Sequence, residues 1–166
     1  MNVEICTYLD SPIGRLMLAG TPAALTALEF LRHKPAPPHL AALPVQPEPF
    51  REAVRQLKAY FDGRLREFDL PLAPAGTPFQ MAVWEALRRI PYGQLISYGE
   101  LARRVDRPAP FRAAGAACGR NPIAIIIPCH RVVGGAGDLH GFGGGLDVKE
   151  QLLKLEGSWP VKPIKR

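Results

Sequence analysis

Hydrophobic and polar residues alternate along the first third of the chain. Residues 3–9 alternate, residues 15–19 are apolar, and residues 25–31 follow a Thr-Pro turn. A period of two is typical of short β-strands, and Ser11–Gly14 has the composition of a turn. The pattern predicts three short antiparallel strands.

The next segment changes character twice. Six prolines fall within residues 35–49, and because proline cannot donate a ladder hydrogen bond, we expect an extended surface loop there. Residues 50–61 place apolar side chains at helical spacing, which predicts a helix, and residues 65–70 are interpreted as a last strand. Residues 71–76, again rich in proline, mark a boundary.

The second half is predicted to be mainly helical. Thr77 and Pro78 are typical of a helix start, and Ser97 with Glu100 has capping-box spacing, which predicts a helix over residues 98–105. A further helix is expected over residues 110–118. This pair of short helices matches helix-turn-helix geometry, although such pairs also occur in proteins that do not bind DNA.

Composition supports a compact α/β (α+β) protein. The chain has 166 residues, 47% of them hydrophobic and 22% charged, which suits one domain or two small ones. We expect an N-terminal β-sheet and helix domain over residues 1–74 and a mainly helical domain over residues 75–166. No apolar run is long enough for a membrane helix, so no membrane association is expected. Three cysteines without CxxC spacing indicate free thiols and a cytoplasmic location.

Charge is unevenly distributed. The net charge is +6, and residues 88–131 contain eight arginines against two acids. Arginine suits forked contact with phosphate, so a polyanionic partner is indicated, although a solvated basic face is the alternative.

Cys129 and His130 are the candidate chemical pair. Residues 123–127 form an apolar, largely β-branched run, interpreted as a buried strand that delivers both side chains to a cleft. The imidazole could take the thiol proton while Arg131 favours the anion. Neighbouring side chains of an extended chain point to opposite faces, so the transfer requires a turn or a bridging water. Alternatively, Cys129 is an ordinary buried small residue.

A family resemblance follows from several motifs. They are Ser11-Pro12-Ile13-Gly14, Ile90-Pro91-Tyr92-Gly93, Ser97-Tyr98, Arg112-Ala113, Asn121-Pro122, Ile127-Pro128-Cys129-His130-Arg131-Val132, Gly144-Gly145-Leu146 with Lys149, and Leu152-Leu153 before Glu156-Gly157. Together they resemble the O6-alkylguanine-DNA alkyltransferases, which repair DNA by direct reversal. The resemblance covers essentially the whole chain and implies a ribonuclease-H-like N-terminal domain.

The resemblance implies irreversible, single-turnover transfer of the alkyl group from guanine O6 to Cys129, without a cofactor. It assigns His130 as proton acceptor through water, Glu156 as its orienting carboxylate, Tyr98 as hydrogen-bond and proton donor to guanine, and Asn121 as a brace of the turn. The implied substrate pocket consists of Phe142, Gly143, Val132 and Arg131. Phe142 stands where the family often has a phenol, so a hydroxyl contact would be lost.

The implied partner is double-stranded DNA containing O6-alkylguanine, contacted in the minor groove with the lesion rotated out of the duplex. Arg112 would fill the gap that the rotated base leaves in the duplex. The other implied DNA contacts are Ala113, Ala114, Gly115, Tyr98 and Arg120. A monomer is expected, with cooperative binding along DNA left open. Neither a metal site nor a nucleotide-binding glycine loop has the required spacing.

Two other functions stay open at this point. A lesion sensor of the alkyltransferase-like type would bind without reacting, but such relatives lack the acceptor cysteine that Cys129 supplies. A Cys-His hydrolase with Glu156 as its third member would turn over many times and would not depend on DNA.

Overall fold

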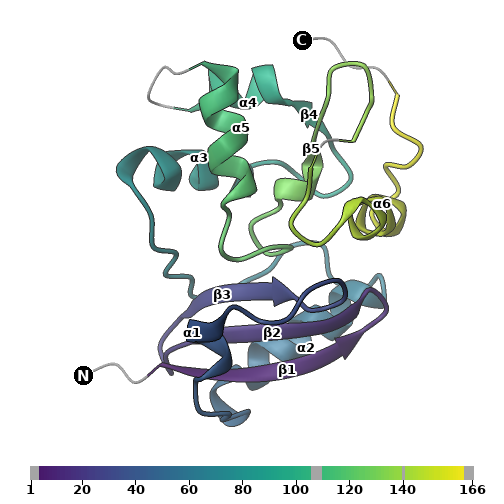
Figure 1. The fold of residues 1–166 in the computed structure, drawn as a ribbon. Coiled ribbons are helices and arrows are strands. Elements are labelled where there is room, and N and C mark those ends of the chain that lie inside the picture. Colours follow the sequence, from purple (N-terminus) through teal and green to yellow (C-terminus); the bar gives the residue numbers. More distant parts are fainter. Residues whose placement is uncertain (1–3, 106–109, 140, 163–166) are drawn as a thin grey trace. The chain divides into compact units, whose positions relative to one another are not determined.

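The computed structural model describes residues 4–105, 110–139 and 141–162. The chain divides into two compact units, Met1–Ala75 and Gly76–Arg166, and each is described by itself. In agreement with the expected fold class, a small antiparallel sheet belongs to the first unit and most of the helices to the second (Figure 1).

Three antiparallel strands form the sheet of the first unit, in the order β1-β2-β3, as the alternating pattern predicts. They are β1 (Ile5–Ser11), β2 (Gly14–Gly20) and β3 (Leu25–Phe30). The turn between β1 and β2 pairs Ser11 with Gly14, and Gly14 has a φ of 101°, which a residue without Cβ adopts at little cost.

Helical segments lie on both faces of this sheet (Figure 1). They are α1 (Pro38–Ala41), the 3-10 turn η1 (Glu48–Phe50) and α2 (Arg51–Phe61). Leu40 of α1 packs against one face in a cluster with Cys6, Met17, Ala19 and Ala27, while α2 covers the other face. Because successive strand residues point to opposite faces, both layers bury apolar side chains.

Two expectations for this unit are wrong. Residues 35–49 are not simply an extended loop. They contain α1, whose Pro38 suits the first helical position, and Val45 bridges to Cys6 of β1. Residues 65–70 form no strand. The Gln56 side chain instead bonds both backbone groups of Asp69, at 2.9 and 3.0 Å, and supplies the partners that a neighbouring strand would otherwise provide.

Helices dominate the second unit, as predicted. They are α3 (Pro78–Arg88), α4 (Tyr98–Arg104), α5 (Phe111–Gly119) and α6 (Leu146–Leu155), with the 3-10 turn η2 (Cys129–Arg131) before α6. Thr77 caps α3 and Ser97 caps α4 through their hydroxyls. Within the described segments, no helix has both the length and the apolarity needed to cross a bilayer.

A short parallel pairing joins β4 (Ile96–Ser97) to β5 (Val132–Val133). The sequence does not predict it, because each strand has only two residues and neither shows a periodic pattern. The pairing is important for the site, because it places the start of α4 beside the residues that follow Cys129.

Candidate active site

The segment before Cys129 is a turn, and the predicted strand over residues 123–127 is wrong. Ile125 has a φ of 70°, and Ile127 N donates to Ile123 O at 3.0 Å, which closes the turn. Asn121 holds it: its Nδ2 donates to Ile127 O at 2.7 Å, and its Oδ1 accepts from Ile123 N at 3.0 Å. The β-branched run is typical of a strand, but the Asn121 side chain satisfies the backbone groups that a strand neighbour would pair.

Cys129 begins the 3-10 turn η2 directly after Pro128 and is 9% exposed. Burial raises the pKa of its thiol above the ordinary value, and the Asn121 side chain and the Lys149 charge offset only part of that rise. The resting form is therefore the thiol, and reaction requires a proton acceptor. A second buried thiol is close by, since Cys118 Sγ lies 3.9 Å from the carbonyl oxygen of Cys129.

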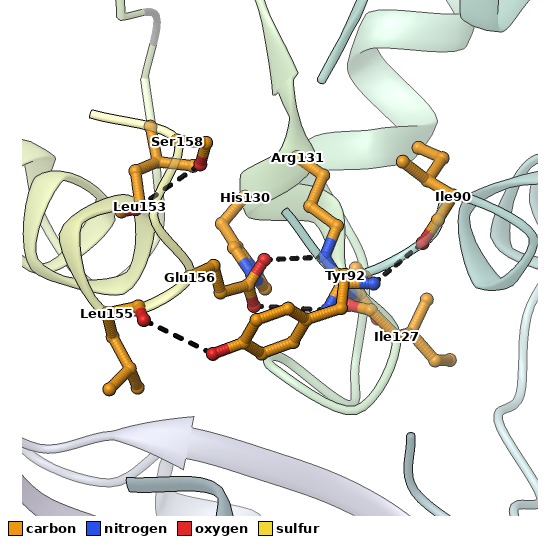
Figure 2. A network of polar contacts seen from close by, with 10 residues as sticks. Ile90, Tyr92, Ile127, His130, Arg131, Leu153, Leu155, Glu156 and Ser158 are labelled. Atoms are coloured by element: carbon orange, nitrogen blue, oxygen red, sulfur yellow. Dashed lines mark hydrogen bonds and ion pairs between the residues drawn. The ribbon is translucent and has the colours of Figure 1, made fainter. Parts of the chain in front are cut away.

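His130, Glu156 and Arg131 form a buried network (Figure 2). His130 Nε2 lies 2.7 Å from Glu156 Oε2, and Arg131 donates from Nε to Oε1 at 2.8 Å and from Nη2 to Oε2 at 3.0 Å. Arg131 Nη1 also donates to Ile90 O at 2.6 Å. The carboxylate thus binds both the imidazole and the guanidinium, and its Oε2 contacts both of them.

The charges of this network fix the tautomer of His130. Burial alone would raise the pKa of Glu156, but the contacts with His130 and Arg131 outweigh it and lower that pKa. Burial lowers the pKa of His130, although Glu156 opposes the shift. A neutral imidazole beside an ionised carboxylate must carry its proton on Nε2. Nδ1 is then an acceptor, and it is buried without a partner among the described residues.

Arg131 is not the residue that favours the thiolate of Cys129, although the sequence suggests that it is. Its guanidinium is paired with Glu156, and the influences that lower the Cys129 pKa come instead from Asn121 and Lys149. Lys149 is 1% exposed, and its Nζ donates to Val132 O at 2.7 Å. Lys149 belongs to the motifs shared with the family, but the family resemblance implies no role for it. Its spacing is a signal in the sequence, because Lys149 and Leu153 share one face of α6 with the C-cap residue Glu156.

The Ile90–Gly93 segment supports the end of α6. Tyr92 Oη donates to Leu155 O at 3.2 Å, next to Glu156. Gly93 has a φ of 79°, and a Cβ at this position would lie 3.2 Å from Glu156 O. A side chain at Gly93 would therefore be strained and would crowd the backbone that carries the carboxylate.

Tyr98 forms the wall of an adjacent hollow. This hollow, of about 300 Å³, is lined by Tyr98, Phe111, Arg112, Gly115 and Gly141. Burial and the neighbouring thiols raise the pKa of Tyr98, so its hydroxyl stays protonated and can donate a hydrogen bond. A Cβ on Gly115 would lie 3.5 Å from the Tyr98 ring, so α5 approaches that ring closely.

The other residues expected to contact DNA differ in their exposure to solvent. Arg112 and Arg120 are exposed and Ala113 is half-buried, whereas Ala114 is 0% exposed and faces the interior rather than a DNA surface. Trp84 helps to seat α5 by donating from Nε1 to Ala117 O at 2.9 Å.

The four residues assigned to the substrate pocket also differ. Phe142 is half-buried and Gly143 is exposed, whereas Val132 and Arg131 are buried. None of the four is among the residues that line the hollow beside Tyr98. The described residues include no group of three or more His, Cys, Asp or Glu side chains that could hold a metal ion.

Together the fold and the site define a protein with exposed arginines at both ends of α5 and a buried cysteine followed directly by the histidine of a buried His-Glu pair. Comparison with known families agrees with that class. Residues 5–74 match the 6-O-methylguanine DNA methyltransferase, ribonuclease-like domain, and residues 78–158 match the 6-O-methylguanine DNA methyltransferase, DNA binding domain. The chain belongs to the methylated-DNA–protein-cysteine methyltransferase family.

Individual relatives are similar over most of their length. The methylated-DNA–protein-cysteine methyltransferase of Methanosarcina acetivorans is 52% identical over 149 residues, which cover 90% of this chain and 96% of the relative. The Mycobacterium leprae protein of the same name is 52% identical over 151 residues, 91% of each chain. The crystal structure of Mycobacterium tuberculosis OGT in complex with DNA has a TM-score of 0.84 and 48% identity, covering 95% of this chain and 94% of that one.

Proposed function

We propose that the chain repairs O6-alkylguanine in double-stranded DNA by moving the alkyl group irreversibly to its own Cys129. The observation that supports this most directly is the pinning of His130 Nε2 by Glu156 at 2.7 Å. This contact leaves Nδ1 of a neutral imidazole as a proton acceptor one residue from a buried thiol.

The chemistry is one displacement. The Cys129 thiol gives its proton through a bridging water to His130, and Sγ attacks the alkyl carbon as the bond from that carbon to O6 breaks. The electron pair passes to guanine, and Tyr98 donates a proton so that guanine departs neutral. The proton taken up by His130 balances the one that Tyr98 gives away. Glu156 stabilises the imidazolium that forms, and Asn121 keeps the turn behind Cys129 in place.

The lesion must leave the duplex before Cys129 can reach it. We assign α4 and α5 to a helix-turn-helix that approaches the minor groove, with the exposed Arg112 filling the gap left by the rotated base. Ala113, Gly115 and Arg120 would contact the backbone or the groove. The hollow beside Tyr98 would take the guanine, with Phe142 stacking on it and Gly143 in the adjoining loop.

A thioether is not displaced by water under mild conditions, so each chain acts once and needs no cofactor. Residues 75–166 would form the reacting domain and residues 1–74 the second domain. The protein would act as a monomer in the cytoplasm. The three unbridged cysteines fit a reducing compartment.

The test is a titration of the protein with a duplex that carries one O6-methylguanine labelled in the methyl group. We expect transferred label to reach a plateau at one methyl group per chain, with much slower transfer from the same lesion in a single strand. Release of label into solution over many cycles would support the Cys-His hydrolase. Tight binding of the damaged duplex without transfer would support the lesion sensor. Either result would overturn the proposal.

A further inference from the structure

Phe111 is an aromatic side chain that the protein leaves in solvent. Its exposed fraction is 57%, and the other strongly exposed large hydrophobic residues of the described segments, Val45, Met81 and Leu146, are aliphatic. Leaving a phenyl ring in water forfeits the free energy of burying it, and a partner that covers the ring would recover that free energy.

The position of Phe111 indicates what it contacts. It is the first residue of α5 and directly precedes the exposed Arg112. It lies one helical turn from Gly115, whose backbone approaches the Tyr98 ring. Phe111 and Tyr98 both line the hollow of about 300 Å³ and a second hollow of about 370 Å³. The ring therefore stands at the rim of the hollow proposed to take the guanine, beside the residue proposed to enter the duplex.

We infer that Phe111 stacks on a nucleobase next to the extruded guanine and keeps the opened base step from closing. This inference rests on the proposed function and adds a second contacting side chain to Arg112. A phenyl ring can stack on any base because every base has a π-face. Apolar wedges inserted between base steps are a general means of opening a duplex from the minor groove, and the neighbouring arginine supplies the contact with phosphate.

The experiment compares one duplex substrate with one free base. Single-turnover rates are measured for wild type, Phe111→Ala, Phe111→Trp and the control Met81→Ala, on a duplex with one O6-methylguanine and on free O6-benzylguanine. For Phe111→Ala we expect a fall of about ten-fold on the duplex, equivalent to about 1.4 kcal/mol and within the range of one base–aromatic stack. The rate on the free base should fall much less than the rate on the duplex, because the ring still lines the hollow but no base step has to be opened.

Two further variants complete the pattern. Phe111→Trp should restore most of the duplex rate because indole also stacks, and Met81→Ala should react like wild type.

Two results for Phe111→Ala would overturn the inference. A similar fall in rate on both substrates would mean that Phe111 acts only as a wall of the pocket, and an unchanged rate on the duplex would mean that the ring does not stack. If wild type reacts with neither substrate, the proposed function itself fails. If wild type reacts and Phe111→Ala reacts with the duplex at the same rate, the stacking role alone is refuted and the proposed function stands.

Discussion

Lys149, within α6, and Glu156, its C-cap, lie seven residues apart on the same buried face and are 1% and 5% exposed. One helix therefore brings a cation near Cys129 and an anion to His130. Lys149 favours loss of the thiol proton, and Glu156 favours its capture by the imidazole. The two opposite charges support the same proton transfer from its two ends.

Glu156→Gln tests the role of the carboxylate that contacts His130. The substitution leaves the buried Arg131 without its counter-charge, so we expect a loss of about 3–5 kcal/mol in the free energy of unfolding. The transfer rate should fall by about 100-fold, because a neutral amide neither stabilises the imidazolium nor fixes the tautomer of the neutral imidazole. Urea unfolding and single-turnover kinetics measure both effects. Glu85→Gln, whose carboxylate is paired with Arg88 at the surface, is the matched control and should change neither by much.

The pH dependence of transfer tests the proton acceptor. The pKa of His130 is lowered from 6.5 and that of Cys129 is raised from 9.0. Between these values the imidazole is neutral and the thiol is protonated, so transfer through His130 should proceed at a nearly constant rate from pH 7 to 8.5. A rate that climbs about ten-fold per pH unit over this range would instead indicate simple ionisation of the thiol.

The same shift predicts how folding stability responds to acid. Because the folded state resists protonation of His130, the unfolded state binds more protons as the pH falls below about 6.5, and stability decreases. The lowered pKa of Glu156 adds a loss that occurs only in stronger acid. Urea unfolding at pH 7.5, 6.5 and 5.5 measures the first effect. A stability that rises toward pH 5.5 would contradict the assignment of a neutral, buried His130.

Lys149→Met tests the role of the positive charge near Cys129 while keeping a long side chain. We expect the pKa of Cys129 to rise further and the transfer rate to fall by about ten-fold. The unfolding free energy should decrease by about 1–3 kcal/mol, because Val132 O loses its donor. Iodoacetamide labelling of the Cys129 peptide across pH measures the thiol. Lys154→Met, at an exposed pair with Glu150, controls for loss of a lysine. A Cys129 pKa equal in both variants would remove Lys149 from the account.

Phe142→Tyr tests which hydroxyl supplies the proton. Tyr98 is already a protonated donor at the hollow, so a hydroxyl added at Phe142 should change the duplex rate by less than ten-fold. Single-turnover kinetics measure this change. A larger acceleration would show that Tyr98 alone does not provide the contact that the reaction requires.

Several elements could be predicted because their signals are local. The three strands follow from alternation, and α3 and α4 begin where Thr77 and Ser97 cap them. The two wrong strands share one physical cause. At residues 65–70 and 123–127 the side chains of Gln56 and Asn121 pair with the backbone, and such a pairing leaves no periodic trace in the sequence.

The site was predictable only in part. The motif around Cys129 draws attention to His130 and Glu156, but the pairing of Arg131 with Glu156 brings together residues 25 positions apart. No local pattern reveals that Arg131 is directed at this carboxylate rather than at the thiol. Burial of Ala114 was likewise hidden, because alanine suits both a packed helix face and a DNA-facing one.

The central claim is that Cys129 Sγ accepts the alkyl group, and mass spectrometry of the whole protein and its peptides tests it most directly. After mixing with a duplex carrying one O6-methylguanine, wild type should gain one methyl group, located on the Cys129 peptide. Cys129→Ala should gain none. Cys118→Ala, which removes the neighbouring buried thiol, should still gain one on Cys129. A methyl group on Cys118, or an unchanged mass for wild type after complete repair of the duplex, would contradict the account.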